Sequence, residues 1–194
     1  MLKFQTLALG DYQTNCYILY EEGSTTCAII DPGYEPKRVL AAVKALGRTV
    51  EAILLTHGHF DHVGGVKSIA EQTGCKVYLC TEDLKLPPYY TNGTLYYTHG
   101  YAEGDTLNIA GLEIKVIHTP GHTPGSVCLM VENVIFTGDT LFRRSCGRTD
   151  IGGDWDTLKN SLRRFRTLPD CAVYPGHGES SSVYEELKYN PYLR

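Results

Sequence analysis

Residues 56–62 (THGHFDH) place four side chains that can bind a metal ion within six residues. Imidazole is a common zinc ligand, and carboxylate suits harder divalent ions. The apolar run 52–55 before them predicts a strand, at whose end His57 and His59 can point to one side while Asp61 and His62 point elsewhere. One segment can therefore contribute to two metal sites, and two adjacent ions can generate a nucleophilic hydroxide at neutral pH.

Three later segments repeat this arrangement. His122 lies in TPGHTPGS, Asp139 in TGDT and His177 in YPGHG, and each follows a strand-like run, at 113–117, 134–136 and 172–174. A rigid scaffold commonly presents a site on such loops at the ends of its strands. The first segment alone could be a solvated loop. The later histidines could be neutral core residues, but a core histidine does not need glycine and proline on both sides. The four segments together indicate a metal centre.

Two other histidines have different interpretations. His118 lies four residues before His122, and we expect it to support that loop through hydrogen bonds and not to bind metal. His99 lies in a tyrosine-rich segment, residues 86–101, which has no clear period. That segment is either a surface loop packing its rings on the domain or a lid beside the metals, since long irregular loops are often functional.

The elements that hold these residues alternate between strands and helices. Pro36 can open a helix that Gly47 closes, residues 64–73 predict a helix that stops at Gly74, and Asp154 can cap a helix over 155–167. The spacing of the apolar residues in that last helix predicts a buried face formed by Trp155, Leu158, Leu162 and Phe165. A further, C-terminal helix is predicted by the capping-box spacing of Ser182 and Glu185. We expect strands at 4–9, 16–20, 27–30, 52–55, 77–80, 107–109, 112–117, 127–131, 134–136 and 172–174. This order favours two sheets with helices outside.

Composition excludes several classes of protein. The chain has 194 residues, 42% of them hydrophobic, which fits one soluble domain over residues 1–194. A net charge of −4 without a basic run argues against nucleic acid as a partner. No apolar stretch could span a membrane, and the N-terminus lacks a signal-peptide pattern. The seven cysteines form no Cys-x-x-Cys pair, so we expect reduced thiols in a cytoplasmic protein.

The order of His57, His59, Asp61, His62, His122, Asp139 and His177 resembles that of the metallo-β-lactamase superfamily. The sequence GDTLF at 138–142, followed by CGR at 146–148, resembles the glyoxalase II (hydroxyacylglutathione hydrolase) branch and the persulfide dioxygenases. The resemblance runs from residue 15 to residue 192 and implies an α+β fold, the four-layer αββα sandwich.

The resemblance also implies a division of roles. The first metal would be held by His57, His59 and His122, and the second by Asp61, His62 and His177, with Asp139 bridging them. The expected cofactor is a pair of divalent ions, zinc first, with iron or manganese as alternatives. Asp61 would also align the attacking hydroxide. Arg148 matches a basic residue that contacts glutathione in glyoxalase II, although an ion pair with Asp150 or Asp154 is the structural alternative.

The chain departs from full-length glyoxalase II in two places. It ends soon after Asn190-Pro191, so no C-terminal helical glutathione-binding domain is expected, and Gly178-Glu179 stands where those enzymes have a tyrosine. We therefore expect a short bacterial-type hydrolase of S-acyl-glutathione-type thioesters, whose partner is this small-molecule substrate. The sequence is compatible with a monomer or an oligomer. The alternatives are a persulfide dioxygenase with one iron on His57, His122 and Asp139, or a hydrolase of another ester, a lactone, a phosphodiester or a β-lactam.

Overall fold

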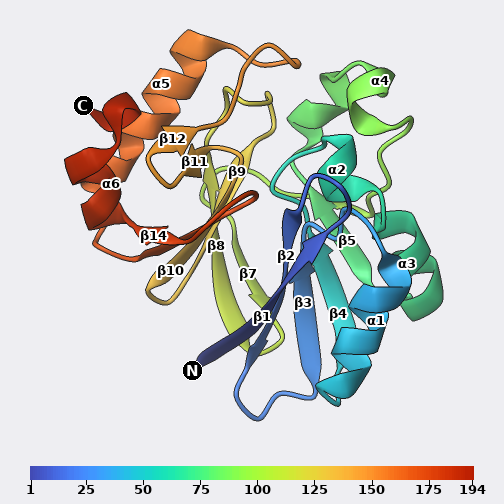
Figure 1. The fold of residues 1–194 in the computed structure, drawn as a ribbon. Coiled ribbons are helices and arrows are strands. Elements are labelled where there is room, and N and C mark those ends of the chain that lie inside the picture. The colour runs from blue at the N-terminus through green and yellow to red at the C-terminus, as the bar shows by residue number, and fades with distance from the viewer.

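The computed structural model describes residues 1–194 and contains two six-stranded sheets that face each other (Figure 1). In spatial order the first sheet contains β1 (Leu2–Leu9), β2 (Thr14–Glu21), β3 (Thr26–Ile30), β4 (Thr49–Leu54), β5 (Lys76–Leu79) and β6 (His99–Gly100). The second contains β14 (Ser181–Ser182), β13 (Ala172–Pro175), β10 (Val134–Gly138), β9 (Val127–Val131), β8 (Leu112–His118) and β7 (Thr106–Ile109). A short hairpin pairs β11 (Leu141–Phe142) with β12 (Ser145–Cys146).

Helices cover the outer face of each sheet. The first sheet carries α1 (Pro36–Ala45) and α3 (Val66–Thr73), and the second carries α5 (Trp155–Arg163) and α6 (Val183–Tyr189). Two single-turn helices, α2 (Phe60–Val63) and α4 (Pro88–Thr91), and three 3₁₀ turns, η1 (Thr81–Lys85), η2 (Arg164–Thr167) and η3 (Pro191–Leu193), complete the chain. The predicted four-layer αββα sandwich is confirmed.

Three apolar clusters hold the layers together, and alternation along the strands divides residues between them. In β3, Ala28 and Ile30 face the cluster between the sheets, whereas Cys27 and Ile29 face the cluster under α1 and α3. A third cluster joins the second sheet to α5 and α6, with Phe165 at its centre. Strands buried on both faces need the continuous apolar runs that the sequence shows.

The predicted helix over 64–73 begins two residues late. The structure has α2, a break at Gly64 and Gly65, and then α3, with Gly74 closing α3 in a left-handed conformation as expected. A Cβ atom on Gly64 would lie 2.4 Å from the Gly33 carbonyl oxygen, and one on Gly65 would lie 2.5 Å from that of Pro32. These glycines let the chain pass close to the turn at residues 31–33, and this close approach interrupts the helix.

The predicted helix over 155–167 is shorter, and Trp155 is not in the core. The α-helix ends at Arg163 and continues as η2, while the Asp154 side chain caps it by accepting from Thr157 N. Trp155 is 40% exposed because it begins the helix and packs edge-on against Tyr192 of η3, not against the sheet. Leu158 and Phe165 are buried as predicted.

The tyrosine-rich segment 86–101 divides between structural and surface positions. It contains α4 and β6, so it is not a single irregular loop. Tyr101 is buried between the sheets, whereas Tyr89 and Tyr90 of α4 stand together at the surface with ring centroids 4.1 Å apart.

Seven free cysteines are present, six of them buried. None of the helices has the length and apolar character needed to cross a bilayer.

Candidate metal centre

The seven predicted ligand residues converge at the edge of the sandwich beside α2 (Figure 1). The segments that carry them follow β4, β8, β10 and β13, which all end at this edge. Ligand atoms lie within 4.8 Å of one another in two groups of three, namely His57, His59 and His122, and Asp61, His62 and His177. The carboxylate of Asp139 lies between the groups, 3.4 Å from His62 Nε2 and 3.5 Å from both His122 Nε2 and His177 Nε2.

Hydrogen bonds on the outer side of each ring assign the tautomers. His59 Nε2 lies 2.9 Å from the Ile151 carbonyl oxygen, and His122 Nδ1 lies 2.6 Å from that of Arg148. A carbonyl oxygen only accepts, so these nitrogens carry the N–H, and the opposite nitrogens carry lone pairs. The two lone pairs face each other, with His59 Nδ1 and His122 Nε2 only 2.9 Å apart. Such an arrangement suits a cation that both nitrogens bind.

The second group shows the same pattern. His62 Nδ1 donates to Asp31 Oδ2 over 2.9 Å, and His177 Nδ1 donates to the Tyr12 carbonyl over 3.1 Å. The inner Nε2 atoms of His62 and His177 then face each other at 3.4 Å, and Asp61 Oδ2 lies 3.1 Å from His177 Nε2. Two imidazole nitrogens and a carboxylate form a donor set suited to a divalent ion.

Two buried atoms at the centre have no hydrogen-bond partner, namely His57 Nε2 and Asp139 Oδ1. Thr56 Oγ1 donates to Asp31, so it accepts from His57 Nδ1, and the free His57 Nε2 is again a lone pair. Gly176 keeps the space beside Asp139 open, since a Cβ atom there would lie 2.2 Å from Asp139 Oδ1. Buried polar atoms without partners are rare, and here both point into the centre. The residues therefore fit two metal ions.

The electrostatics favour the ligand form in the first group. Burial lowers the pKa of His57 well below its ordinary value, and lowers the pKa of His59 to about 4. Burial by itself would raise the pKa of Asp139, but the adjoining His62, His122 and His177 together outweigh it and hold that pKa below the ordinary value. Burial would lower the pKa of His62, but Asp139 and Asp31 outweigh it and raise that pKa, so a metal ion competes with a proton there. Neutral imidazoles and ionised carboxylates are the forms that bind metal.

Asp31, in the turn at residues 31–33, is a buried positioning residue. It also lies close to His57 and His62, but its carboxylate already accepts from Thr56 N, Thr56 Oγ1 and His62 Nδ1. It therefore orients the ligands and does not bind metal itself. Its place directly after the apolar run 27–30 was the available signal, because the other functional residues also follow strands.

Asp83 is a second buried carboxylate that the sequence did not reveal. It accepts from Gly58 N at 2.7 Å, Gly125 N at 2.6 Å and Thr123 Oγ1 at 3.0 Å. Gly58 separates His57 from His59, and residues 123–125 follow His122. Asp83 thus ties together the two loops that supply the first ligand group.

We expect Asp83→Asn to destabilise the fold by about 2–3 kcal/mol, because the amide nitrogen would face backbone or hydroxyl donors in a buried place. Urea denaturation would measure this change. The matched control is Glu82→Gln, which removes the same charge from the exposed neighbouring residue and should change the stability far less. Equal stability of the two variants would contradict the role given to Asp83.

The remaining histidines lie outside the centre. His118 donates from Nε2 to the Pro124 carbonyl at 2.8 Å, which is the loop-supporting contact expected for it. His99 is exposed and packs against Tyr78, with 5.0 Å between ring centroids. Neither is among the residues grouped around the candidate metals.

A pocket of about 690 Å³ opens above the centre. Five of the candidate ligands form its floor, and Arg148 is the only lysine or arginine in its lining. Arg148 makes the ion pair that the sequence offered as an alternative, since its guanidinium donates twice to Asp150, at 2.6 and 2.5 Å. The Arg148 side chain remains exposed at the edge of the pocket. The walls are formed by Tyr12, Phe60, Tyr89, Tyr90, Phe142, Ser145, Cys146 and Ile151.

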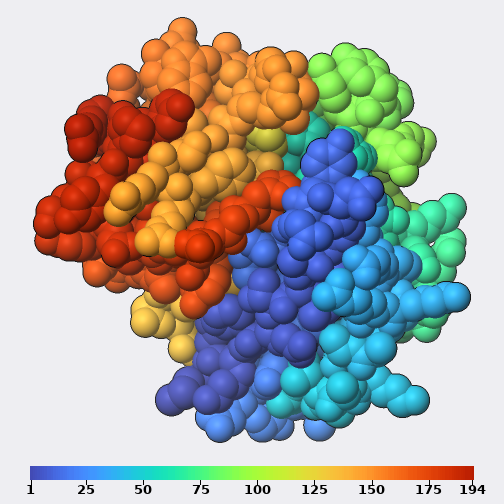
Figure 2. Space-filling model, viewed as in Figure 1, coloured from blue at the N-terminus to red at the C-terminus, as the bar shows by residue number.

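Segments distant in sequence build these walls. Figure 2 shows the C-terminal segment after β13 lying against the N-terminal strands, where Asn15 N donates to the Gly176 carbonyl at 2.7 Å. On the other side α4 reaches the loop before α5, where the Tyr90 hydroxyl donates to the Asp150 carbonyl at 3.5 Å. The pocket is therefore a product of the complete sandwich.

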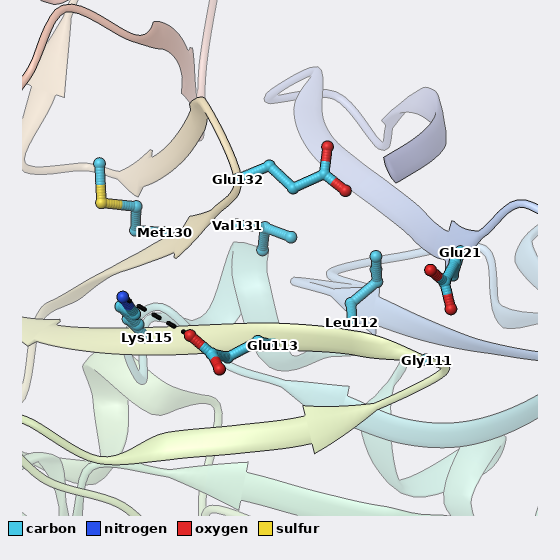
Figure 3. A pocket seen from close by; sticks show the side chains of 8 residues that line it. All are labelled: Glu21, Gly111, Leu112, Glu113, Lys115, Met130, Val131 and Glu132. Carbon is cyan, nitrogen blue, oxygen red and sulfur yellow. Dashed lines mark ion pairs between the residues drawn. The ribbon is translucent and has the colours of Figure 1, made fainter. Parts of the chain in front are cut away.

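A second hollow lies away from the metal centre, between the β7–β8 and β9–β10 turns (Figure 3). Its volume is about 290 Å³, and Glu21, Glu113 and Glu132 stand around it. The N-terminal amine lies 3.5 Å from Glu21 and 3.8 Å from Glu132, and Lys115 pairs with Glu113. The nearby cations offset these carboxylates, and no reactive group lines the hollow.

The family follows from a sequence comparison that agrees with this geometry. The sequence model described as the metallo-beta-lactamase superfamily matches residues 9–177, a range that contains every candidate ligand. This chain belongs to the metallo-beta-lactamase superfamily. The αββα sandwich and the paired histidine and aspartate groups are thus those of a member of this superfamily.

Three relatives align with almost the whole length of this chain. Hydroxyacylglutathione hydrolase GloC from Haemophilus influenzae is 31% identical over 99% of this chain and 98% of its own. The crystal structure of the B3 metallo-beta-lactamase BLEG-1 is 35% identical, covers 98% of this chain and 99% of its own, and has a TM-score of 0.91. The structure of ETHE1 from Myxococcus xanthus is 31% identical, with coverage of 97% and 83% and a TM-score of 0.84.

Proposed function

We propose that this protein is a metal-dependent, glyoxalase II-like thioesterase that hydrolyses S-acyl-glutathione-type thioesters with two zinc ions. The observation that carries the proposal is the inward arrangement of donor atoms, in which five imidazole nitrogens and two carboxylates face one small volume. The full-length similarity to GloC supports thioesters as the substrate class.

When bound, two divalent ions supply a hydroxide nucleophile at neutral pH and a Lewis acid for the carbonyl. One water is consumed, the acyl C–S bond breaks, and the products are a carboxylate and a thiol. Asp61 lies on the pocket floor with its Oδ2 held by Thr14 Oγ1 at 3.2 Å, so its carboxylate can orient the proton of the attacking oxygen. A thiolate is weakly basic, so the walls need no strong acid for the leaving group.

The test combines metal analysis with an assay. Elemental analysis of the purified, unsupplemented protein should give close to two zincs per chain, and the protein should hydrolyse S-lactoylglutathione to lactate and glutathione. One iron per chain with little zinc, or two zincs without thioester cleavage, would refute the proposal.

The proximity of His57, His122 and Asp139, with Asp139 Oδ2 3.5 Å from His122 Nε2, favours a second candidate, a persulfide dioxygenase with one iron on these three residues. Oxygen uptake with glutathione persulfide distinguishes it from the thioesterase. The complete second donor group of Asp61, His62 and His177 favours the dinuclear hydrolase. The likeness to BLEG-1 makes a β-lactam a substrate to include in the same panel, together with a lactone.

Arg148→Ala should raise KM for S-lactoylglutathione about two- to fivefold and leave the zinc content unchanged. The modest size follows from the exposure of Arg148 and from its competing pair with Asp150, since solvent weakens the contacts of exposed charges. Steady-state kinetics would measure KM. Arg163→Ala, at an exposed arginine of α5 outside the pocket lining, is the control. A loss of zinc in the Arg148 variant would contradict a substrate-binding role.

A further inference from the structure

Resting on the proposed thioesterase function, we propose that the acyl group of the substrate is aromatic, and that Tyr12, Phe60 and Phe142 form the site that selects it. The lining of the pocket is asymmetric around the metal centre, and this asymmetry separates an acyl side from a thiol side.

The thiol side lies next to His59 and carries the only arginine. The ring of Tyr90 lies 6.1 Å from that of His59, and the His59 Nε2 atom donates to the carbonyl of Ile151. Arg148 stands on the same side, since its carbonyl accepts from His122 and its partner residue Asp150 accepts from Tyr90. A fixed cation suits the carboxylates of a glutathione-type thiol.

The acyl side lies around His177 and has no lysine or arginine in its lining. The Phe142 ring lies 6.1 Å from that of His177, and the Tyr12 carbonyl accepts from His177 Nδ1. The rings of Tyr12 and Phe60 meet edge to face, with centroids 5.4 Å apart. Three aromatic rings therefore stand on the His177 side of the centre, two of them next to His177 and the third in contact with Tyr12.

Core packing does not account for these three rings. Tyr12, Phe60 and Phe142 belong to none of the three apolar clusters, and Tyr12 is 60% exposed. Phe60 and Phe142 are half-buried, and aromatic rings gathered in a concave site are typical of a binding surface. A lactoyl group is too small and too polar to cover them, whereas a phenyl ring can stack edge to face among them.

The first experiment compares two substrates of the zinc-loaded protein, S-phenylacetylglutathione and S-acetylglutathione. A methylene group separates the phenyl ring from the carbonyl, so the two thioesters have similar intrinsic reactivity. Burial of one ring should raise kcat/KM for the phenylacetyl substrate about tenfold to hundredfold over the acetyl substrate. A ratio near one would overturn the inference and leave the thioesterase function intact.

Variants assign the selectivity to the acyl side. Tyr12→Ala should lower the phenylacetyl-to-acetyl ratio about tenfold, and Tyr12→Phe, which keeps the ring, should preserve it. Tyr89→Ala removes an exposed ring from the other wall and should change both substrates alike. Tyr184 of α6 lies outside the pocket and is as exposed as Tyr12, so Tyr184→Ala should change kcat/KM for neither substrate. A ratio that falls with Tyr89→Ala and not with Tyr12→Ala would refute the assignment of sides.

A binding measurement separates this inference from the proposed function. S-(2-phenylethyl)glutathione and S-ethylglutathione are thioethers that cannot be hydrolysed, and calorimetry of the zinc-loaded protein gives both dissociation constants. Tighter binding of the phenylethyl compound by about tenfold or more supports the aromatic site even if no thioester is cleaved. Equal binding of the two compounds overturns it.

Discussion

Asp61→Asn should lower kcat for thioester hydrolysis by about 10²–10⁴-fold, the usual contribution of a group that positions or accepts a proton. The substitution keeps the size of the side chain and removes its negative charge. In the structure Asp61 Oδ2 lies 3.1 Å from His177 Nε2 and accepts from Thr14 Oγ1, so the carboxylate is held at one place on the pocket floor. Steady-state kinetics with S-lactoylglutathione measures the loss, and urea denaturation should show a far smaller change in stability.

The matched control for Asp61→Asn is Asp11→Asn, which removes the same charge from an exposed residue of the β1–β2 turn. Metal content measured on both variants separates the two roles given to Asp61. Loss of activity with both zincs retained supports orientation of the nucleophile, whereas loss of one zinc assigns the effect to metal binding. Activity equal to that of the unsubstituted protein would exclude both roles.

Removal of metal should lower the melting temperature by about 8–16 °C. The chain without metal places the lone pairs of His59 and His122 opposite each other at 2.9 Å, and leaves His57 Nε2 and Asp139 Oδ1 without partners. Ligand present at about 1,000 times its Kd stabilises the native state by about 4 kcal/mol. One kcal/mol shifts the melting temperature of a chain of this size by about 2–4 °C. Scanning calorimetry with zinc and with a chelator measures the difference.

Two histidine variants make this test specific. His62→Ala removes an inner donor nitrogen of the second group and should reduce the zinc-dependent shift to the part contributed by the first group, whereas His118→Ala should retain the full shift because the His118 side chain bonds only to the Pro124 carbonyl. An identical melting temperature with zinc and with chelator would show that these residues do not form a metal site. A shift of undiminished size in His62→Ala would show that no zinc is bound by the second group.

The sequence by itself was sufficient to predict the candidate ligands and the layers. Candidate metal ligands such as His122 and His177 stand in glycine- and proline-rich turns that follow apolar strands, which is a local pattern. Strand alternation and helical spacing are local as well, so the two sheets and the helices on their outer faces could be predicted, as could the caps at Asp154 and Ser182. Each of these features depends on residues that are close together in the chain.

Only the tertiary structure decided what these side chains do together. His59 donates the hydrogen bond that assigns its tautomer to the carbonyl oxygen of Ile151, 92 residues away. Asp83 joins Gly58 to Gly125 across two loops. The helix break at residues 64–65 and the exposure of Trp155 also depend on neighbours distant in the chain. Local patterns report the preferences of a segment. The direction of a lone pair and the walls of a pocket depend instead on close contacts between distant segments, which form only when the sandwich closes.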